Sequence, residues 1–207
     1  GAETHIAQLA RGLSSLHLQV TLLSSGGAGA DALEREGIAQ IRIPSLCRRS
    51  PLALLQNTLA LRRILRRESF SLIHVHARLP ALLLHLAGTG RIPVLVTAHA
   101  LLRKTPLLRR LSFWGTQTVA VSEDIRLHLI RTYGLPAERI TVIPNGIDLS
   151  AFSPCEKPSP RQGPRVAFVS RLDADCSLGA WLLCEIAPRL AKEFPSLTIR
   201  IAGGGSD

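Results

Sequence analysis

Residues 71–99, "SLIHVHARLPALLLHLAGTGRIPVLVTAH", decide the fold of this chain. The segments 71–77 and 92–99 are runs of Val, Ile and Leu with little alternation, which is typical of strands covered on both faces. The segment 78–88 between them has the apolar spacing of a helix. A strand, a crossover helix and a second strand form a βαβ unit, in which the two strands run parallel. The stretch therefore predicts an α/β fold built on parallel sheet.

The same alternation continues on both sides of this unit, through the first 150 residues. Further strands are predicted at 18–24, 38–44, 117–122 and 139–145, and further helices at 2–16, 28–36, 51–67, 105–113 and 123–132. Strands that alternate with helices indicate a doubly wound parallel sheet.

A change in composition marks a domain boundary. Residues 145–164 hold four prolines and two glycines without an apolar period, which is typical of a linker. We place the first domain at 1–150, the linker at 151–164, and the start of a second α/β domain at 165–207, where a strand, a helix and a strand follow again. The chain has no Met and ends on a glycine turn just after a strand, so we expect it to be a fragment of a longer protein.

Composition and charge narrow the classes of protein. Hydrophobic residues make up 46% and charged residues 19%, as in globular domains, and no apolar stretch reaches the ~20 residues that span a bilayer. Residues 1–150 carry 18 Lys and Arg against 9 Asp and Glu, which favours an anionic partner over a neutral one. An arginine-rich solvated surface is the competing interpretation. Only 4% of residues are aromatic, which argues against a reader of single-stranded nucleic acid.

Polar residues at predicted strand ends are the candidates for ligand binding, because ligands of parallel sheets bind beyond the carboxyl ends of the strands. His99 ends one such strand and offers a neutral imidazole for proton transfer or for a sugar hydroxyl. Arg171 ends the first strand of the second domain, and its guanidinium fork suits a diphosphate. Gly1, before the first helix, allows backbone N–H groups to approach a phosphate.

Two further features carry weaker predictions. His74 and His76 share a strand face, but no third metal ligand is apparent from the sequence, so packing and hydrogen bonding are the preferred interpretation.

On a helix over 61–67 the arginines fall on one side and Leu61, Ile64 and Leu65 on the other. With a second basic group, this face predicts attachment to an anionic membrane surface. The arginines are Arg62, Arg63, Arg66 and Arg67, and the second group is Arg103, Lys104, Arg109 and Arg110.

The motifs, in their order, resemble one family. They are "GAETH" (1–5), "TAH" (97–99), "VSE" (121–123), "VIPNGIDLSAF" (142–152) and "SRLD" (170–173). This series is similar to that of the family 4 retaining glycosyltransferases, which have the GT-B fold: two Rossmann-like parallel-sheet domains facing a cleft. The resemblance spans nearly the whole chain, and "VIPNGIDLSAF" is its most specific part.

The resemblance implies a function and roles for particular residues. It implies transfer of a sugar, with retention, from a nucleotide-diphosphate sugar to a glycan or lipid-linked acceptor, in cell-envelope polysaccharide or glycolipid synthesis. His99 matches the histidine that contacts the transferred sugar, Gly1 and Arg171 match groups at the donor diphosphate, and Glu3 matches an acceptor-side position. No metal or cofactor is implied, and no nucleic acid. The implied location is the cytoplasm, peripheral on the inner face of the cytoplasmic membrane.

Two departures from the family pattern qualify these roles. Cys176 occupies the position of the lysine that normally accompanies the arginine on the diphosphate. The paired glutamates for the nucleotide ribose and donor sugar do not occur in these 207 residues, and neither does the first strand of the fold, so we expect the chain alone to be inactive. A GT-B sugar-nucleotide epimerase, or a non-catalytic basic α/β binding module, remains the alternative.

Overall fold

The computed structural model describes residues 1–101, 110–149, 152, 163–170, 172 and 178–205. The chain forms two compact units, Gly1–Ile147 and Asp148–Asp207. Residues 105–109 of the predicted helix at 105–113 and most of the predicted linker fall outside the described residues.

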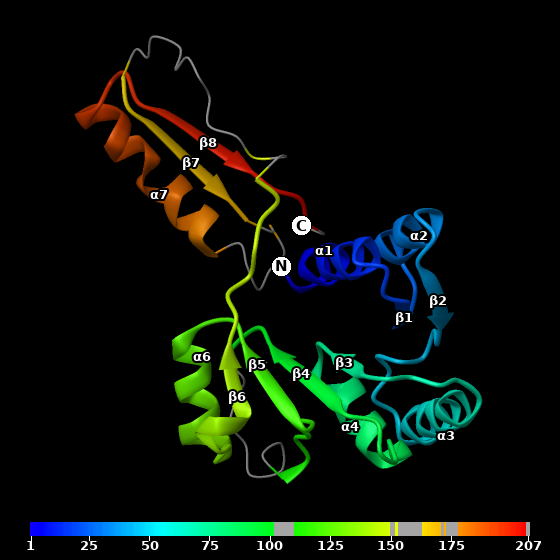
Figure 1. Cartoon of the computed structure of the whole chain (residues 1–207). Coiled ribbons are helices and arrows are strands. Elements are labelled where there is room, and N and C mark those ends of the chain that lie inside the picture. The colour runs from blue at the N-terminus through cyan, green and yellow to red at the C-terminus, as the bar shows by residue number, and fades with distance from the viewer. Residues whose placement is uncertain (102–109, 150–151, 153–162, 171, 173–177, 206–207) are drawn as a thin grey trace. The chain divides into compact units, whose positions relative to one another are not determined.

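The described part of the first unit contains six short parallel strands and the helices between them (Figure 1). β1 pairs with β2, and a second sheet has the order β3-β4-β5-β6. The strands are β1 (Thr21–Ser24), β2 (Ala39–Arg42), β3 (Ile73–Val75), β4 (Val94–Ala98), β5 (Gln117–Ala120) and β6 (Ile140–Val142). The helices are α1 (Ala2–Ser15), α2 (Ala28–Arg35), α3 (Pro51–Arg67), α4 (Arg78–Ala87) and α6 (Glu123–His128), followed by the π-helix η1 (Leu129–Tyr133) and the 3₁₀ turn η2 (Ala137–Arg139).

The predicted α/β class with parallel strands is confirmed, and among the described residues the strands of the first domain fall into two sheets. β1 and β3 are not hydrogen-bonded to each other, so the six strands form two sheets. Periodicity identifies each strand separately and carries no information about which strands pair. The observed strands are also shorter than the apolar runs that predicted them, because the runs extend into the flanking turns.

Local sequence signals explain where the helices begin. Ser50 precedes Pro51, and its side chain accepts a hydrogen bond from the backbone N–H of Ala53 at 3.3 Å. Ser122 caps α6 in the same way, accepting from the N–H of Ile125 at 3.3 Å. Both are N-caps of the kind expected from serine before an apolar-periodic segment.

The core of this unit lies between the four-stranded sheet and its helices. Val75, Val94 and Val96 of β3 and β4 pack with Ala81 and Leu84 of α4. Leu83 of α4 is fully buried in a second cluster, to which α3 also contributes. Burying each such side chain contributes about 1.5–3 kcal/mol, so these contacts fix β3 and β4 against each other and hold their carboxyl ends in place.

The described residues of the second unit form one parallel β-α-β arrangement, in the predicted order. β7 (Arg165–Val169) pairs with β8 (Thr198–Ala202), and α7 (Leu178–Glu193) connects them. Among the described residues, no helix is both long enough and apolar enough to cross a membrane.

Candidate functional site

The carboxyl end of β3 presents two histidines toward its neighbours. His74 lies within β3, and its Nε2 is 2.7 Å from Thr97 Oγ1 on β4. His76 follows the strand, and its ring lies against that of His74, with 4.1 Å between the centroids. The prediction that these two side chains share a face and form hydrogen bonds is confirmed.

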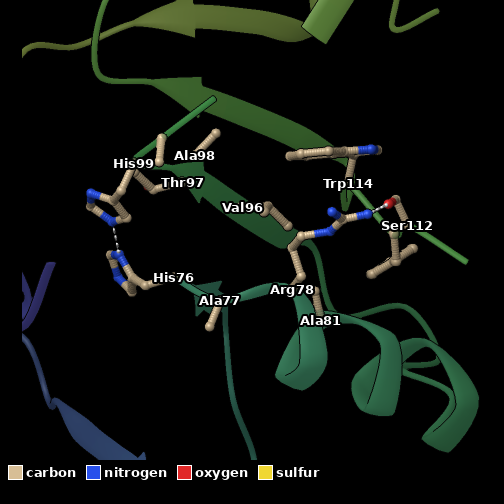
Figure 2. Close-up of a pocket in the computed structure, with 12 residues that line it drawn as sticks. His76, Ala77, Arg78, Ala81, Val96, Thr97, Ala98, His99, Ser112 and Trp114 are labelled. Carbon is tan, nitrogen blue, oxygen red and sulfur yellow. Dashed lines mark hydrogen bonds between the residues drawn. The ribbon is translucent and has the colours of Figure 1, made fainter. Parts of the chain in front are cut away.

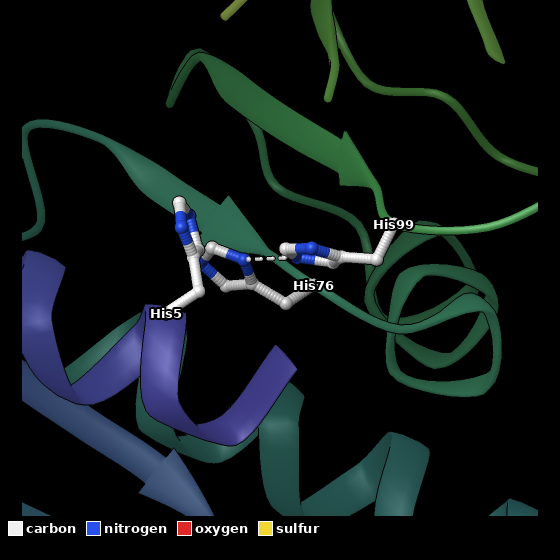
Figure 3. A group of neighbouring side chains, drawn as sticks. All are labelled: His5, His76 and His99. Carbon is white, nitrogen blue, oxygen red and sulfur yellow. Dashed lines mark hydrogen bonds between the residues drawn. The ribbon is translucent and has the colours of Figure 1, made fainter. Parts of the chain in front are cut away.

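Two further histidines converge on His76 from distant parts of the chain. His99 follows β4, and its Nε2 is 3.1 Å from His76 Nδ1 (Figure 3). His5 lies in the first turn of α1, where its backbone N–H donates to the carbonyl of Gly1 at 3.0 Å. The His5 ring centroid is 5.7 Å from that of His76 and 5.1 Å from that of His99. All three imidazoles are half-buried.

Burial favours the neutral form of His74, His76 and His99. Desolvation, followed by the neighbouring His74, His99 and His5, lowers the pKa of His76 to about 3. Desolvation, with smaller contributions from His5 and His99, lowers the pKa of His74 to about 4. The pKa of His99 is also lowered, by burial first and then by His5 and the terminal amine of Gly1. At neutral pH the rings of His74, His76 and His99 therefore each have one N–H donor and one acceptor nitrogen.

A small pocket of about 120 Å³ lies beside His99. Figure 2 shows His76 and His99 at one end, and Arg78, Ser112 and Trp114 at the other. Arg78, the first residue of α4, donates to Ser112 Oγ at 2.6 Å. Ligand sites that enclose a drug-sized molecule usually measure about 300–1,000 Å³, so this pocket has room for one small group rather than a nucleotide sugar.

Two nitrogen atoms at this pocket are buried without a hydrogen-bond partner among the described residues: His99 Nδ1 and Trp114 Nε1. Buried polar atoms are nearly always paired in folded proteins, and an exception points to a bound water or ligand group. His99 Nδ1 is therefore a candidate contact for such a group.

The structure brings together some of the predicted site residues. Gly1 is the exposed residue that precedes α1, and its amine is close enough to lower the pKa of His99. Glu3 is exposed in the first turn of α1. Arg171 and Cys176 lie outside the described residues.

Two residues of the site, His5 and Arg78, were not among those predicted from the sequence. His5 belongs to the "GAETH" motif, four residues after Gly1, so helical spacing placed it one turn above a predicted phosphate contact. Arg78 directly follows the end of a predicted strand, and the rule that selected His99 also applies to it. Both signals were available from the sequence.

Solved structures with a similar fold include two glycosyltransferases. A glycosyltransferase from Rickettsia africae superposes with a TM-score of 0.71 at 19% identity, over 99% of this chain and 65% of that one. The lipopolysaccharide outer core galactosyltransferase WaaB gives a TM-score of 0.71 at 16% identity, over 100% of this chain and 58% of that one. A UDP-N-acetylglucosamine 2-epimerase from Rickettsia bellii is less similar, with a TM-score of 0.54 at 15% identity over 96% of this chain and 59% of that one. The fold is therefore of the GT-B glycosyltransferase type, as predicted.

Sequence comparison gives the family. Residues 1–151 match the profile of Glycosyltransferase Family 4, and the chain belongs to this family, which confirms the resemblance carried by the motifs. A phosphatidylinositol N-acetylglucosaminyltransferase subunit from Arabidopsis thaliana is 26% identical over 156 residues, which cover 70% of this chain and 34% of that protein. The chain thus spans about a third of this relative and less than two thirds of the two glycosyltransferase structures.

Proposed function

We propose that this chain is the acceptor-side domain and the opening of the donor-binding domain of a retaining glycosyltransferase. The complete enzyme moves a sugar from a nucleotide-diphosphate sugar to a glycan or lipid-linked acceptor, in cell-envelope polysaccharide or glycolipid synthesis. The observation that carries this proposal is His99 in a chain of this family: its Nδ1 is buried beside a pocket and has no partner among the described residues.

The site chemistry supports this role for His99. A neutral imidazole held at Nε2 by His76 has its Nδ1 available for a sugar hydroxyl. The pocket of about 120 Å³ has room for such a group, and the rest of a nucleotide sugar would bind elsewhere. In this proposal Gly1 and Arg171 contact the diphosphate, Glu3 lies on the acceptor side, and the leaving diphosphate is stabilised by Arg171 and helix N-termini.

The experiment is a transfer assay with the complete enzyme. UDP-N-acetylglucosamine and UDP-galactose serve as donors, and phosphatidylinositol vesicles and a lipopolysaccharide core oligosaccharide as acceptors. These probes follow the names of two similar proteins. We expect acceptor-dependent release of a nucleoside diphosphate, and a product whose anomeric configuration, measured by NMR, equals that of the donor. The 207-residue chain alone is the control and is expected to be inactive.

Other outcomes would contradict the proposal. A product with inverted anomeric configuration would show that the sugar is not transferred with retention. Interconversion of sugar nucleotides without any acceptor would support the epimerase alternative, and no consumption of any donor would favour a non-catalytic binding module.

The position of Cys176 leads to a prediction about donor affinity. If Arg171 holds the diphosphate without a lysine partner, then Cys176→Lys in the complete enzyme adds a second charged contact. One such contact is worth about 1.5–3 kcal/mol, so the donor KM should fall about ten- to hundredfold. Cys176→Ala is the matched control and should leave the donor KM unchanged. An unaltered donor KM in Cys176→Lys would mean that this position does not meet the diphosphate.

The exposed face of α3 supports attachment of the enzyme to an anionic membrane surface, on the cytoplasmic side. The first half of α3 carries three exposed leucines with the spacing i, i+3 and i+7. They are Leu52, Leu55 and Leu59, which are 64%, 58% and 39% exposed.

The predicted arginine side of α3 is also exposed, while Leu61 is buried. Arg62 also donates to the carbonyls of Ala87 and Leu86 at 3.0 and 3.1 Å, which leaves Arg63, Arg66 and Arg67 for lipid. Of the second basic group, only Arg110 is described.

An apolar stripe followed by arginines on one helix is the pattern of an interfacial helix. We expect the 207-residue chain to sediment with phosphatidylcholine vesicles that contain phosphatidylglycerol, and not with phosphatidylcholine alone. Each basic residue near such a surface contributes about 1 kcal/mol, so Arg66→Glu should weaken binding about tenfold or more. Leu55→Gln should weaken it as well. Arg131→Glu, an equal charge change at an exposed site on η1, is the control. Equal sedimentation with both vesicle types at low salt would contradict the attachment.

A further inference from the structure

Three histidines from separate parts of the first unit meet at one point. His5 comes from α1, His76 follows β3 and His99 follows β4, as Figure 3 shows. Their ligand nitrogens all lie within 4.8 Å of one another, and this is the only such group of metal-ligating side chains among the described residues. From the sequence alone, His74 and His76 have no apparent third ligand for a metal. The fold supplies His5 and His99 instead.

The spacing of the three rings matches a tetrahedral metal site. Zn–N bonds of about 2.0 Å place ligand nitrogens about 3.3 Å apart and imidazole centroids about 5.2 Å apart. The observed distance between His76 Nδ1 and His99 Nε2 is 3.1 Å. The three centroid separations are 5.7, 5.1 and 5.4 Å. Two ligands are therefore already in position, and the third needs an adjustment of about 1.5 Å by a side chain on the first turn of a helix.

The chemistry of the donors selects the kind of metal. Imidazole nitrogen suits zinc and its neighbours in the first transition row, whereas calcium and magnesium take oxygen ligands. Metal binding requires a ring nitrogen that carries no proton, and a neutral imidazole has one such nitrogen. We propose that His5, His76 and His99 form a binding site for Zn²⁺, with three protein ligands and a fourth position open to water or an anion.

Occupancy would also determine the proton position on His99. In the metal-free protein, the proton between His76 Nδ1 and His99 Nε2 belongs to only one of the two rings. With His99 Nε2 on the metal, the proton of the neutral ring sits on Nδ1, so His99 becomes a hydrogen-bond donor at its unpartnered atom. This consequence depends on the proposed function, whereas the metal site itself does not.

The test measures binding of the metal alone to the untagged, EDTA-treated 207-residue chain. Isothermal titration with Zn²⁺ should show one saturable site per chain, and Mg²⁺ should show none. Titration with Co²⁺ should give the intense visible absorption of a four-coordinate ion. His5→Ala and His76→Ala should each lower the Zn²⁺ affinity by at least about 100-fold, since even a lost outer-shell contact costs up to that much.

The controls separate the site from other zinc ligands on the chain. His85→Ala removes an exposed histidine outside the cluster, one that stacks on Phe113, and should leave binding unchanged. Acetylation of the Gly1 amine should also leave it unchanged. His5→Gln, with circular dichroism to verify the fold, provides a second variant if His5→Ala does not fold. Absence of one-to-one binding, or equal affinity in His5→Ala and His85→Ala, would overturn the proposal. Both results are independent of transferase activity.

Discussion

In the complete enzyme, His99→Ala is expected to lower kcat/KM by about 100-fold or more, the usual effect of losing a positioned polar or proton-transfer group. A 100-fold loss corresponds to about 2.7 kcal/mol of transition-state stabilisation. The physical reason is the geometry of the ring: Nε2 faces His76 at 3.1 Å, while Nδ1 is buried without a partner among the described residues. Alanine removes both nitrogens and enlarges the pocket.

The measurement is steady-state kinetics with the donor varied, alongside thermal unfolding of each variant. His85→Ala is the matched control because it deletes an imidazole of equal size at an exposed position of α4. His76→Gln is informative as a positioning variant. It retains a hydrogen-bonding side chain next to His99 and should reduce kcat less than His99→Ala does. Full activity in a folded His99→Ala variant would show that this histidine has a structural role only.

Most of the secondary structure could be predicted because its signals are local. The helix predicted at 51–67 has the observed bounds, since Pro51 starts it and the apolar period runs to its end. The helix predicted at 123–132 is present, but it continues from α6 into a π-helix at Leu129–Tyr133. A π-turn shifts the hydrogen bond by one residue and scarcely changes the apolar pattern, so periodicity does not distinguish it from an α-helix.

The site was less predictable because it depends on contacts between distant segments. The shared face of His74 and His76 follows from the two-residue period of a strand. The approach of His5 to His76 depends on where α1 lies relative to the ends of β3 and β4, and no local pattern encodes that placement. The division of the six strands into two sheets escaped prediction for the same reason. Pairing is a tertiary property, whereas the sequence pattern reports only which segments are strands.

The largest effect on stability is expected at Gly115, which lies just before β5. Its φ of +67° is in the left-handed region, where a side chain costs about 1–2 kcal/mol. A Cβ added there would meet the carbonyl oxygen of Val94 at 2.3 Å and Val96 Cγ2 at 3.1 Å. The first distance is too short for any real contact, so the backbone itself must move.

The backbone at this point has little freedom to move. Thr116 donates its N–H to the same Val94 oxygen at 2.7 Å, and its Oγ1 accepts from the N–H of Val94 at 2.9 Å. Arg139 also donates to the carbonyls of Gly115 and Thr116. Displacing Gly115 therefore strains the pairing of β4 with β5 at its start. We expect Gly115→Ala to lower the free energy of unfolding by about 4 kcal/mol, from the left-handed φ and the overpacking together.

Gly90→Ala is the control that isolates the steric part of this cost. Gly90 has a similar φ of +60°, but a Cβ there would meet nothing within 4 Å. Gly90→Ala should therefore lower the free energy of unfolding only by the conformational cost, about 1–2 kcal/mol. Urea unfolding of both variants, with equal slopes, gives the two free energies. Since small domains are stable by only about 5–15 kcal/mol, Gly115→Ala should be largely unfolded at urea concentrations where Gly90→Ala is still native. A difference of less than about 1 kcal/mol between the two variants would mean that the start of β5 yields without disturbing β4, contrary to the tight pairing of these two strands.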